Sequence, residues 1–211
     1  MIKIDVLKLD QLKHDLKALL SQGEPKRMEN NVDTYTQASV LLPLFIKNGH
    51  YWLLLMRRAN TVEYHKGEVS FPGGVVDEKD DNLESTAKRE TFEEIGVRED
   101  DIEILGQLDD MTTITSRFIV HPFVGIVPFP YEFNLNRSEV DRLIEVPLQF
   151  FLDPSQPRAF SIHYKGETFE TPAFIYEGIV IWGATERILE NFISVIRPKL
   201  ASLRSAIGIL E

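Results

Sequence analysis

The spacing of apolar residues along the chain predicts long helices separated by groups of short strands. Apolar residues recur at helical intervals over residues 10–22, 82–95 and 184–204. Shorter apolar runs, typical of strands, lie over residues 39–47, 50–56, 102–108, 118–127, 163–164, 167–169 and 173–182. A further short helix is expected over residues 138–144, and Pro147 should end it.

Turn and cap residues define some of these elements more closely. The dipeptide Asn48–Gly49 joins the first two strand runs and favours the tight type I′ turn of a β-hairpin. A second turn is expected at Lys165–Gly166. Asp81 and Glu84 form a pair like a capping box before the second helix, and Gly96 suits its left-handed end.

The order of these elements predicts an α/β fold. Because helices and strands interleave and at least two hairpins are present, the sheet should be mixed and flanked by helices on both faces. Residues 1–31 are expected to form an N-terminal helix and linker packed on the domain, and residues 32–211 a single domain. The length of 211 residues suits this division.

Composition and charge exclude several classes of protein. The chain has no cysteine, so disulfides, thiolate metal sites and a cysteine nucleophile are excluded. A net charge of −10 counts against nucleic acids or anionic membranes as main partners. Because no signal peptide or membrane-length apolar run is found, a cytoplasmic protein is expected. A homodimer is compatible with the sequence, although no surface stripe requires it.

Carboxylates gather on one face of the second expected helix. Glu90, Glu93 and Glu94 fall within an arc of about 100°, while Phe92 and Ile95 should lie on the apolar side. Like charges at this spacing destabilise an isolated helix by about 0.2–0.5 kcal/mol. A bound cation would explain the stripe, and ligands that are all oxygen favour Mg²⁺ or Mn²⁺.

Three glutamates on one helix face are explained equally well by a bound cation and by exposure of that face to solvent. The loop that precedes the helix distinguishes these two interpretations. Gly73 and Gly74 lie just before the helix. Without a Cβ atom, these residues allow the backbone to approach a ligand and leave carbonyl groups free to bind a metal. The glycine pair and the acidic stripe together therefore indicate a metal site.

The same residues resemble the Nudix box. Residues 89–97 (RETFEEIGV) are similar to the second half of that pattern, with Thr91 in place of its usual aliphatic residue. The interval from Gly74 to Arg89 is one residue longer than usual, and Asp80 or Asp81 stands where a loop glutamate normally lies. Upstream, residues 54–59 (LLMRRA) and 65–74 (HKGEVSFPGG) resemble the signature of the coenzyme A pyrophosphatase branch, as do residues 115–125, 145–148 and 181–185.

This resemblance implies a fold, a reaction and a set of site residues. The fold would be a Nudix-type α/β/α sandwich, and the reaction hydrolysis of coenzyme A or its derivatives to 3′,5′-ADP and 4′-phosphopantetheine. The metal ligands would be Glu90, Glu93 and Glu94 with a carbonyl of Gly73 or Gly74; Arg89 would orient a helix glutamate, and Glu90 or Glu93 would accept the proton of water. Contacts to the substrate would come from Arg57, Arg58, His65, Lys66, Gly67 and Glu68, with Glu68 an outside candidate for the base.

Two alternatives remain open at this point. The box specifies the reaction but not the substrate, so a diphosphatase for ADP-ribose or NADH is the main competitor. A catalytically silent nucleotide sensor is less favoured, because such proteins typically lose the box glutamates that this chain keeps. Trp182 and Phe192 are expected to belong to the core, and an adenine-stacking role for an aromatic residue in the later loops stays open as the alternative.

Overall fold

A computed structural model of the chain describes residues 6–22, 24–28, 35–62, 65–113, 116–156, 159–164 and 167–197. Its elements, in chain order, are α1 (Val6–Gln22), β1 (Thr36–Lys47), β2 (His50–Arg58), β3 (Val69–Ser70), β4 (Gly73–Val75), α2 (Leu83–Ile95), η1 (Glu99–Asp101), β5 (Glu103–Gln107), β6 (Met111–Thr112), β7 (Phe118–Ile126), β8 (Val140–Pro147), α3 (Leu148–Leu152), β9 (Ala159–Tyr164), β10 (Glu167–Tyr176), β11 (Ile179–Trp182) and α4 (Gly183–Ile196).

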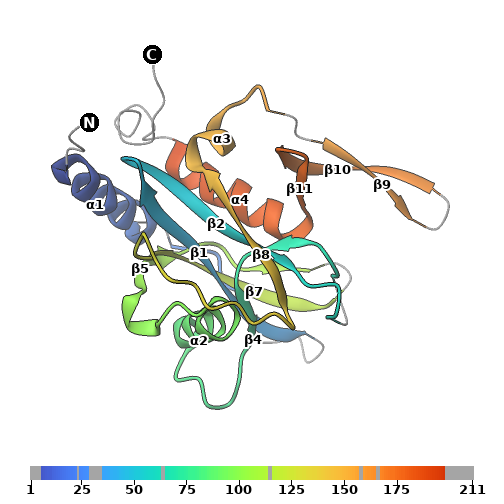
Figure 1. Cartoon of the computed structure of the whole chain (residues 1–211), viewed down its shortest axis with the longest axis horizontal. Helices are drawn as coiled ribbons and strands as arrows, with labels where there is room; N and C mark the ends of the chain where they lie inside the picture. The colour runs from blue at the N-terminus through green and yellow to red at the C-terminus, as the bar shows by residue number, and fades with distance from the viewer. Residues whose placement is uncertain are drawn as a thin grey trace.

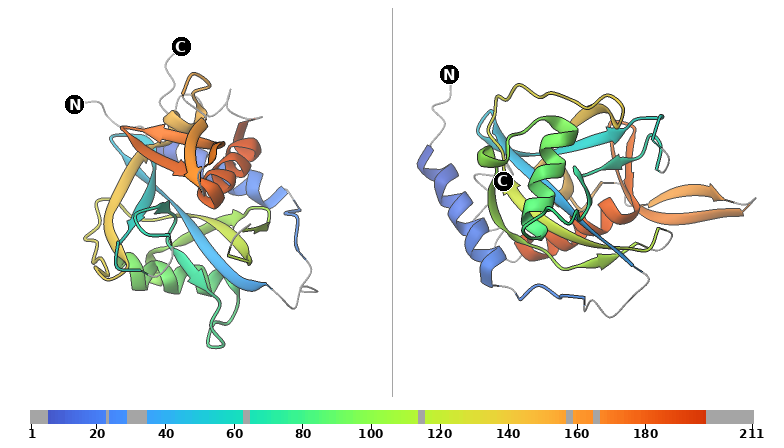
Figure 2. Two further views of the ribbon diagram at one scale, coloured as in Figure 1. Left: turned by 90° about the vertical axis from the view of Figure 1, so that its right-hand side faces the viewer. Right: turned by 90° about the horizontal axis from the view of Figure 1, so that it is seen from below.

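The central sheet is mixed, as the sequence predicts. Its strand order is β3-β2-β1-β7-β5, and β4, β6 and β8 pair with β1, β7 and β2 respectively. The pair β1–β7 is parallel, while β1–β2 and β2–β8 are antiparallel. A second sheet, β11-β10-β9, carries a hairpin that projects from the body of the molecule (Figure 2).

Helices cover both faces of the large sheet (Figure 1). Successive side chains of a strand point to opposite faces, and β1 shows this directly. Its residues Leu42 and Leu44 pack in one buried cluster with residues of α1 and α4, whereas Leu41 and Phe45 pack in another with residues of α2. The expected layer order, helix–sheet–helix, is therefore confirmed.

The sheet opens where the glycine loop enters it. β1 pairs with β2 only near their shared turn, at residues 44–47 and 50–53. Farther along, β1 pairs with β4, and β2 pairs with β3. The segment from β3 to β4 is thus inserted between the two strands of the hairpin, which brings the glycine pair to the split end of the sheet.

Local sequence signals predicted two of these elements well. Asn48 and Gly49 have positive φ angles of 54° and 79°, as the expected type I′ turn requires. Helix α2 ends at Gly96 in the left-handed conformation, also as expected. Its N-cap, however, is Asn82, whose side chain accepts from the backbone N–H of Ser85 while the Ser85 hydroxyl accepts from Asn82. The capping box therefore begins one residue after the expected Asp81.

Other expectations require correction. Residues 138–144 were expected to be helical, but Val140–Pro147 forms strand β8, antiparallel to β2, and the short helix α3 follows it. Helix α1 begins before Asp10, and α4 ends at Ile196; residues 198–204 of its expected extent lie outside the described residues, as does the Lys165–Gly166 turn. Phe192 is fully buried, as expected.

A buried ionic network attaches residues 24–28 to the sheet. The carboxylate of Asp110 accepts hydrogen bonds from the Arg27 guanidinium at 2.9 Å and from the Met28 N–H at 3.0 Å, and it lies 2.8 Å from Nδ1 of His121. Burial alone would raise the pKa of Asp110, but these bonds, led by that from His121, lower it below its ordinary value. Asp110 therefore carries its charge inside the protein.

Candidate active site

Helix α2 presents its acidic residues to three different environments. The side chain of Glu94 is almost fully buried, that of Glu90 is 16% exposed, and that of Glu93 is 53% exposed. The buried stripe of the helix consists of Thr86, Ala87, Thr91, Glu94 and Ile95. Phe92 is 49% exposed, so its expected position on the inner side is wrong. Glu94, not Phe92, occupies a position that faces the sheet.

The glycine loop docks directly onto two of these carboxylates. The N–H of Gly73 donates a hydrogen bond of 2.9 Å to Oε2 of Glu94. A Cβ atom on Gly74 would lie 2.5 Å from the carboxyl carbon of Glu90, and one on Gly73 would lie 2.4 Å from the carbonyl oxygen of Ser39. Gly73 also has a φ angle of +153°. Neither position can therefore accept a larger residue without displacing its neighbours.

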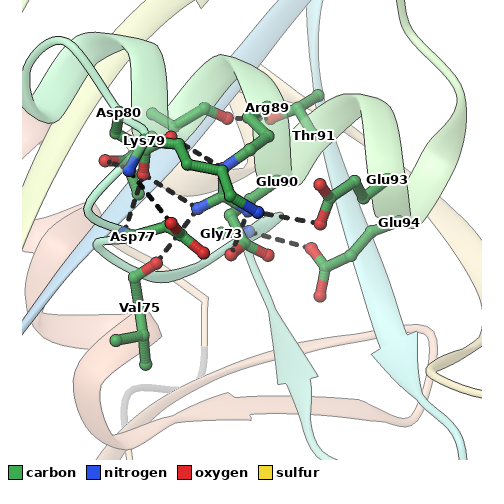
Figure 3. A network of polar contacts seen from close by, with 12 residues as sticks. Gly73, Val75, Asp77, Lys79, Asp80, Arg89, Glu90, Thr91, Glu93 and Glu94 are labelled. Atoms are coloured by element: carbon green, nitrogen blue, oxygen red, sulfur yellow. Dashed lines mark hydrogen bonds and ion pairs between the residues drawn. The ribbon is translucent and has the colours of Figure 1, made fainter.

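Arg89 connects the loop to the acidic face of the helix (Figure 3). Its Nε and Nη2 atoms bind the two oxygens of Asp80 at 2.7 and 2.9 Å, and its Nη1 contacts Glu90 at 2.8 Å and Glu93 at 3.2 Å. Nη2 also donates to the carbonyl of Val75. Of the two loop aspartates that the sequence left open, Asp80 is the partner of this arginine.

The Asp80–Arg89 pair is held tightly. The Asp80 side chain is 4% exposed and also accepts a hydrogen bond from the hydroxyl of Thr86. The hydrogen bonds from Arg89 lower the pKa of Asp80 well below its usual range, and the same contacts raise the pKa of Arg89. Both groups therefore stay charged, and Arg89 is kept in position to hold Glu90 and Glu93.

Burial shifts the protonation of the two inner glutamates. It raises the pKa of Glu94 to about 8, although the Gly73 N–H and the nearby Arg58 act in the opposite direction. Burial also raises the pKa of Glu90, and this effect is partly offset by its contact with Arg89. Near pH 7, Glu94 without a bound cation is therefore mainly protonated.

The donor atoms of this site fit a hard divalent cation. Carboxylate oxygens of Glu90, Glu93 and Glu94 and the carbonyls of the glycine loop are the ligand type that Mg²⁺ and Mn²⁺ prefer. Within the described ranges, no three histidine or acidic side chains already converge in the manner of a metal cluster. The structure brings Glu90 and Glu93 together at Arg89, while Glu94 turns toward Gly73. A cation would thus replace the contacts that now neutralise these groups.

The two consecutive arginines of β2 face opposite sides of the sheet. Nη1 of Arg58 lies 3.9 Å from Oε1 of Glu94, and its buried Nε has no hydrogen-bond partner among the residues that the structure describes. Nε of Arg57 instead donates to the carbonyl of Gly67 at 3.2 Å. Of these two expected substrate contacts, Arg58 therefore lies next to the carboxylates of α2, and Arg57 does not.

Most of the remaining expected contacts line a pocket on the Arg57 side. This pocket has a volume of about 300 Å³ and is lined in part by Arg57, Lys66, Gly67 and Glu68. His65 does not line it; its Nδ1 lies 3.0 Å from Oε2 of Glu68. The structure therefore divides the expected site residues between a carboxylate centre and an adjacent pocket.

Sequence reasoning did not select the pocket residues that come from β8 and β11. Arg142 comes from β8, in the segment expected to be helical, and Trp182 was assigned to the core although it lines the pocket. The alternation of apolar Ile144 and Val146 with polar Glu145 was the available sequence signal for a strand. No local signal distinguished Trp182 from an ordinary core residue.

The sequence is similar to a known protein family. The model described as "NUDIX domain" matches residues 35–163. A Photorhabdus laumondii protein with the name "Uncharacterized Nudix hydrolase NudL" is 35% identical over 167 residues, which cover 79% of this chain and 87% of the relative. A protein with the same name from Yersinia pestis (strain Pestoides F) is 37% identical over 158 residues, covering 75% of this chain and 78% of the relative.

A solved structure agrees with the architecture. The crystal structure of a MutT/nudix family protein from Enterococcus faecalis superposes with a TM-score of 0.55 at 12% identity, covering 94% of this chain and 82% of that one. At this identity the similarity concerns the fold alone. Separately, no helix among the described residues is both long and apolar enough to cross a membrane.

Proposed function

The chain belongs to the Nudix hydrolase family, and on that premise we propose that it hydrolyses the diphosphate bond of coenzyme A or its derivatives, releasing 3′,5′-ADP and 4′-phosphopantetheine. Nudix hydrolases act on nucleoside diphosphate derivatives and generally use Mg²⁺ or Mn²⁺. The observation that carries the reaction class is the hydrogen bond from Gly73 to Glu94, because it joins the glycine loop to the carboxylate helix. The coenzyme A assignment rests on the resemblance of residues 54–59 and 65–74 to the signature of that branch.

In this proposal the acidic residues of α2 have distinct tasks. Glu90, Glu93 and Glu94, with a carbonyl of Gly73 or Gly74, are the ligands of the divalent ion. When bound, the ion supplies charge neutralisation for the diphosphate and activation of the attacking water. Glu90 and Glu93 are the candidates for accepting the proton of that water, because Arg89 holds both carboxylates on the same side of the helix.

The basic residues near the glycine loop would offset the charge of the substrate. A diphosphate is repelled by a protein with a net charge of −10 unless cations lie close to it. Arg58 lies beside Glu94, at the carboxylate centre. Its buried, unpaired Nε shows that part of its hydrogen-bonding capacity is unused within the described part of the chain. We assign Arg58 to a phosphate oxygen of the substrate.

A substrate panel tests this proposal. Coenzyme A, acetyl-coenzyme A, ADP-ribose and NADH would be incubated with the protein and Mg²⁺, Mn²⁺ or EDTA, and the products identified by chromatography. We expect metal-dependent release of 3′,5′-ADP from both coenzyme A substrates. Equal or faster turnover of ADP-ribose or NADH would overturn the coenzyme A assignment.

A pair of variants tests the carboxylate centre. Glu94→Gln removes the buried carboxylate but keeps its shape, and we expect it to abolish metal-dependent turnover while the protein stays folded. Glu99→Gln, at an exposed glutamate of η1, removes the same charge away from the site and should retain activity. Full activity of Glu94→Gln would mean that the metal is held elsewhere.

A further inference from the structure

The pocket beside Arg57 combines positive charge with an apolar wall. Arg57, Lys66 and Arg142 contribute cationic groups, and Glu68 is the acidic side chain that lines it. Residues of β11 and β9, including Trp182, add apolar surface. Resting on the proposed function, we propose that this pocket binds the nucleotide half of the substrate, and that Arg142 binds a phosphomonoester that lies outside the diphosphate.

Strand pairing places the two arginines of the pocket side by side. Arg57 of β2 and Arg142 of β8 are direct partners in the antiparallel register. Cross-strand partners have their side chains on the same face of a sheet, with Cβ atoms about 4.5–5.5 Å apart. Two like charges at this distance repel one another, so the pair is stabilised when an anion lies between them.

Within the described part of the chain, two cationic side chains of the pocket have no acidic partner. Among the residues that the structure describes, the side chains of Arg142 and Lys66 form no ion pair or hydrogen bond, and both residues are exposed. Glu68 is engaged by His65, at 3.0 Å. In an acidic protein, unpaired cations that converge on one concave surface favour an anionic ligand.

The pocket is separate from the carboxylate centre but adjacent to it. Arg58 contacts Glu94, while Arg57 lines the pocket, and consecutive Cα atoms are about 3.8 Å apart. The diphosphate at the carboxylate centre is already provided with a cation site and Arg58. The cations of the pocket therefore bind a different anionic group of the same substrate. The substrate would extend past the end of β2 from the carboxylate centre to the pocket.

Size and surface indicate which half of the substrate enters. A volume of about 300 Å³ is at the lower limit of ligand pockets, so one end of a long substrate fits rather than the whole molecule. Trp182, Ile179 and Phe160 provide aromatic and aliphatic surface suited to a planar base. A base with an attached phosphomonoester describes the 3′-phosphoadenosine end of coenzyme A, which ADP-ribose and dephospho-coenzyme A do not share.

Equilibrium binding tests the pocket independently of catalysis. Adenosine 3′,5′-bisphosphate, AMP and 4′-phosphopantetheine would be titrated into the protein in EDTA by calorimetry, with wild type, Arg142→Gln and Arg142→Lys. We expect the bisphosphate to bind wild type roughly 10–100-fold more tightly than AMP, the range of one hydrogen-bonded charge pair. Arg142→Gln should abolish this difference, and Arg142→Lys should retain part of it.

The exposed Arg98 supplies a matched control, because Arg98→Gln removes the same charge outside the pocket. Equal affinity of wild type for the bisphosphate and AMP would overturn the inference. It would also be overturned if Arg142→Gln kept the wild-type difference in affinity between these two nucleotides, or if wild type bound 4′-phosphopantetheine more tightly than the bisphosphate.

Kinetic measurements distinguish failure of this inference from failure of the proposed function. If wild type hydrolyses no coenzyme A, the proposed function fails while the titration still reports on the pocket; if it hydrolyses coenzyme A and dephospho-coenzyme A with equal kcat/KM, only the present inference fails.

Discussion

The ion pair between Asp80 and Arg89 offers a quantitative test of how the acidic helix is organised. Asp80→Asn removes the negative charge and one acceptor while it keeps the size of the side chain. Arg89 then loses its bidentate partner and is left with the carbonyl of Val75 and the carboxylates of Glu90 and Glu93. We expect a loss of stability together with a loss of order at the carboxylates.

The magnitude follows from the burial of the pair. Removing one partner of a fully buried pair costs about 3–5 kcal/mol, whereas exposed pairs contribute less than about 1 kcal/mol. The Asp80 side chain is 4% exposed and that of Arg89 is 23% exposed, so this pair lies between the two limits. We therefore expect the free energy of unfolding to fall by about 2 kcal/mol, or Tm to fall by about 4–8 °C for a chain of this length.

Urea unfolding of wild type, Asp80→Asn and Asp77→Asn would measure this loss. Asp77 belongs to the same loop and is exposed, and among the described residues its side chain accepts a hydrogen bond only from the N–H of Lys79, so its variant should lose less than about 0.5 kcal/mol. Because the pKa of Asp80 is lowered in the folded protein, its contribution is complete above the ordinary carboxyl pKa of about 3.9 and declines as the pH falls below that value. Equal losses in the two variants would refute the organising role of Asp80.

Four further predictions concern Glu94, Gly74 and Asp110. Because the pKa of Glu94 is raised to about 8 without metal, Mg²⁺ must displace a proton below that pH; calorimetry should show tighter binding from pH 6 to pH 8 and proton release near pH 7, and pH-independent binding would contradict this. The same shift means that the stability of the metal-free protein should decline as pH rises from about 4.5 toward 8, and Glu94→Gln should lack this decline. Gly74→Ala places a methyl group against the Glu90 carboxylate, which must then move aside, and should lower kcat at least tenfold; wild-type kcat would show that this close approach is not needed. Asp110→Asn removes the buried charge that Arg27 and His121 contact and should cost about 1–3 kcal/mol, with faster proteolytic cleavage within residues 24–28; unchanged cleavage would mean that other contacts hold that segment.

Elements with strong local signals could be predicted from the sequence, because neighbouring residues determine them. The hairpin turn requires positive φ at Asn48 and Gly49, and asparagine and glycine are the residues that adopt it most readily. The end of α2 at Gly96 has the same basis. The predicted N-cap of α2, Asp81, is one residue before the observed N-cap, Asn82. Asn, Asp and Ser have similar capping preferences, so only the path of the loop distinguishes these positions.

Strand β8 could not be predicted because its conformation depends on a distant partner. Residues 138–144 contain apolar residues at intervals that fit a helix as well as a strand. The edge of β2 lies far away in the sequence and offers unpaired backbone groups over residues 52–58, and β8 satisfies them. The same pairing brings Arg142 next to Arg57, so Arg142 was missed as a pocket residue for the same reason as the strand.

The exposed Phe92 and the buried Glu94 have a common cause in the rotation of α2 against the sheet. At about 100° per residue, Thr91 lies between Glu94 and Ile95 on the helix surface, and this arc faces the sheet. Turning the helix to bury Phe92 would move Glu94 away from the N–H of Gly73, and the hydrogen bond between loop and helix would be lost. An exposed phenylalanine and a carboxylate protonated in the core both reduce stability. The chain therefore accepts an unfavourable arrangement of α2 that hydrophobic patterning alone does not predict, because this arrangement forms the hydrogen bond on which the proposed metal site depends.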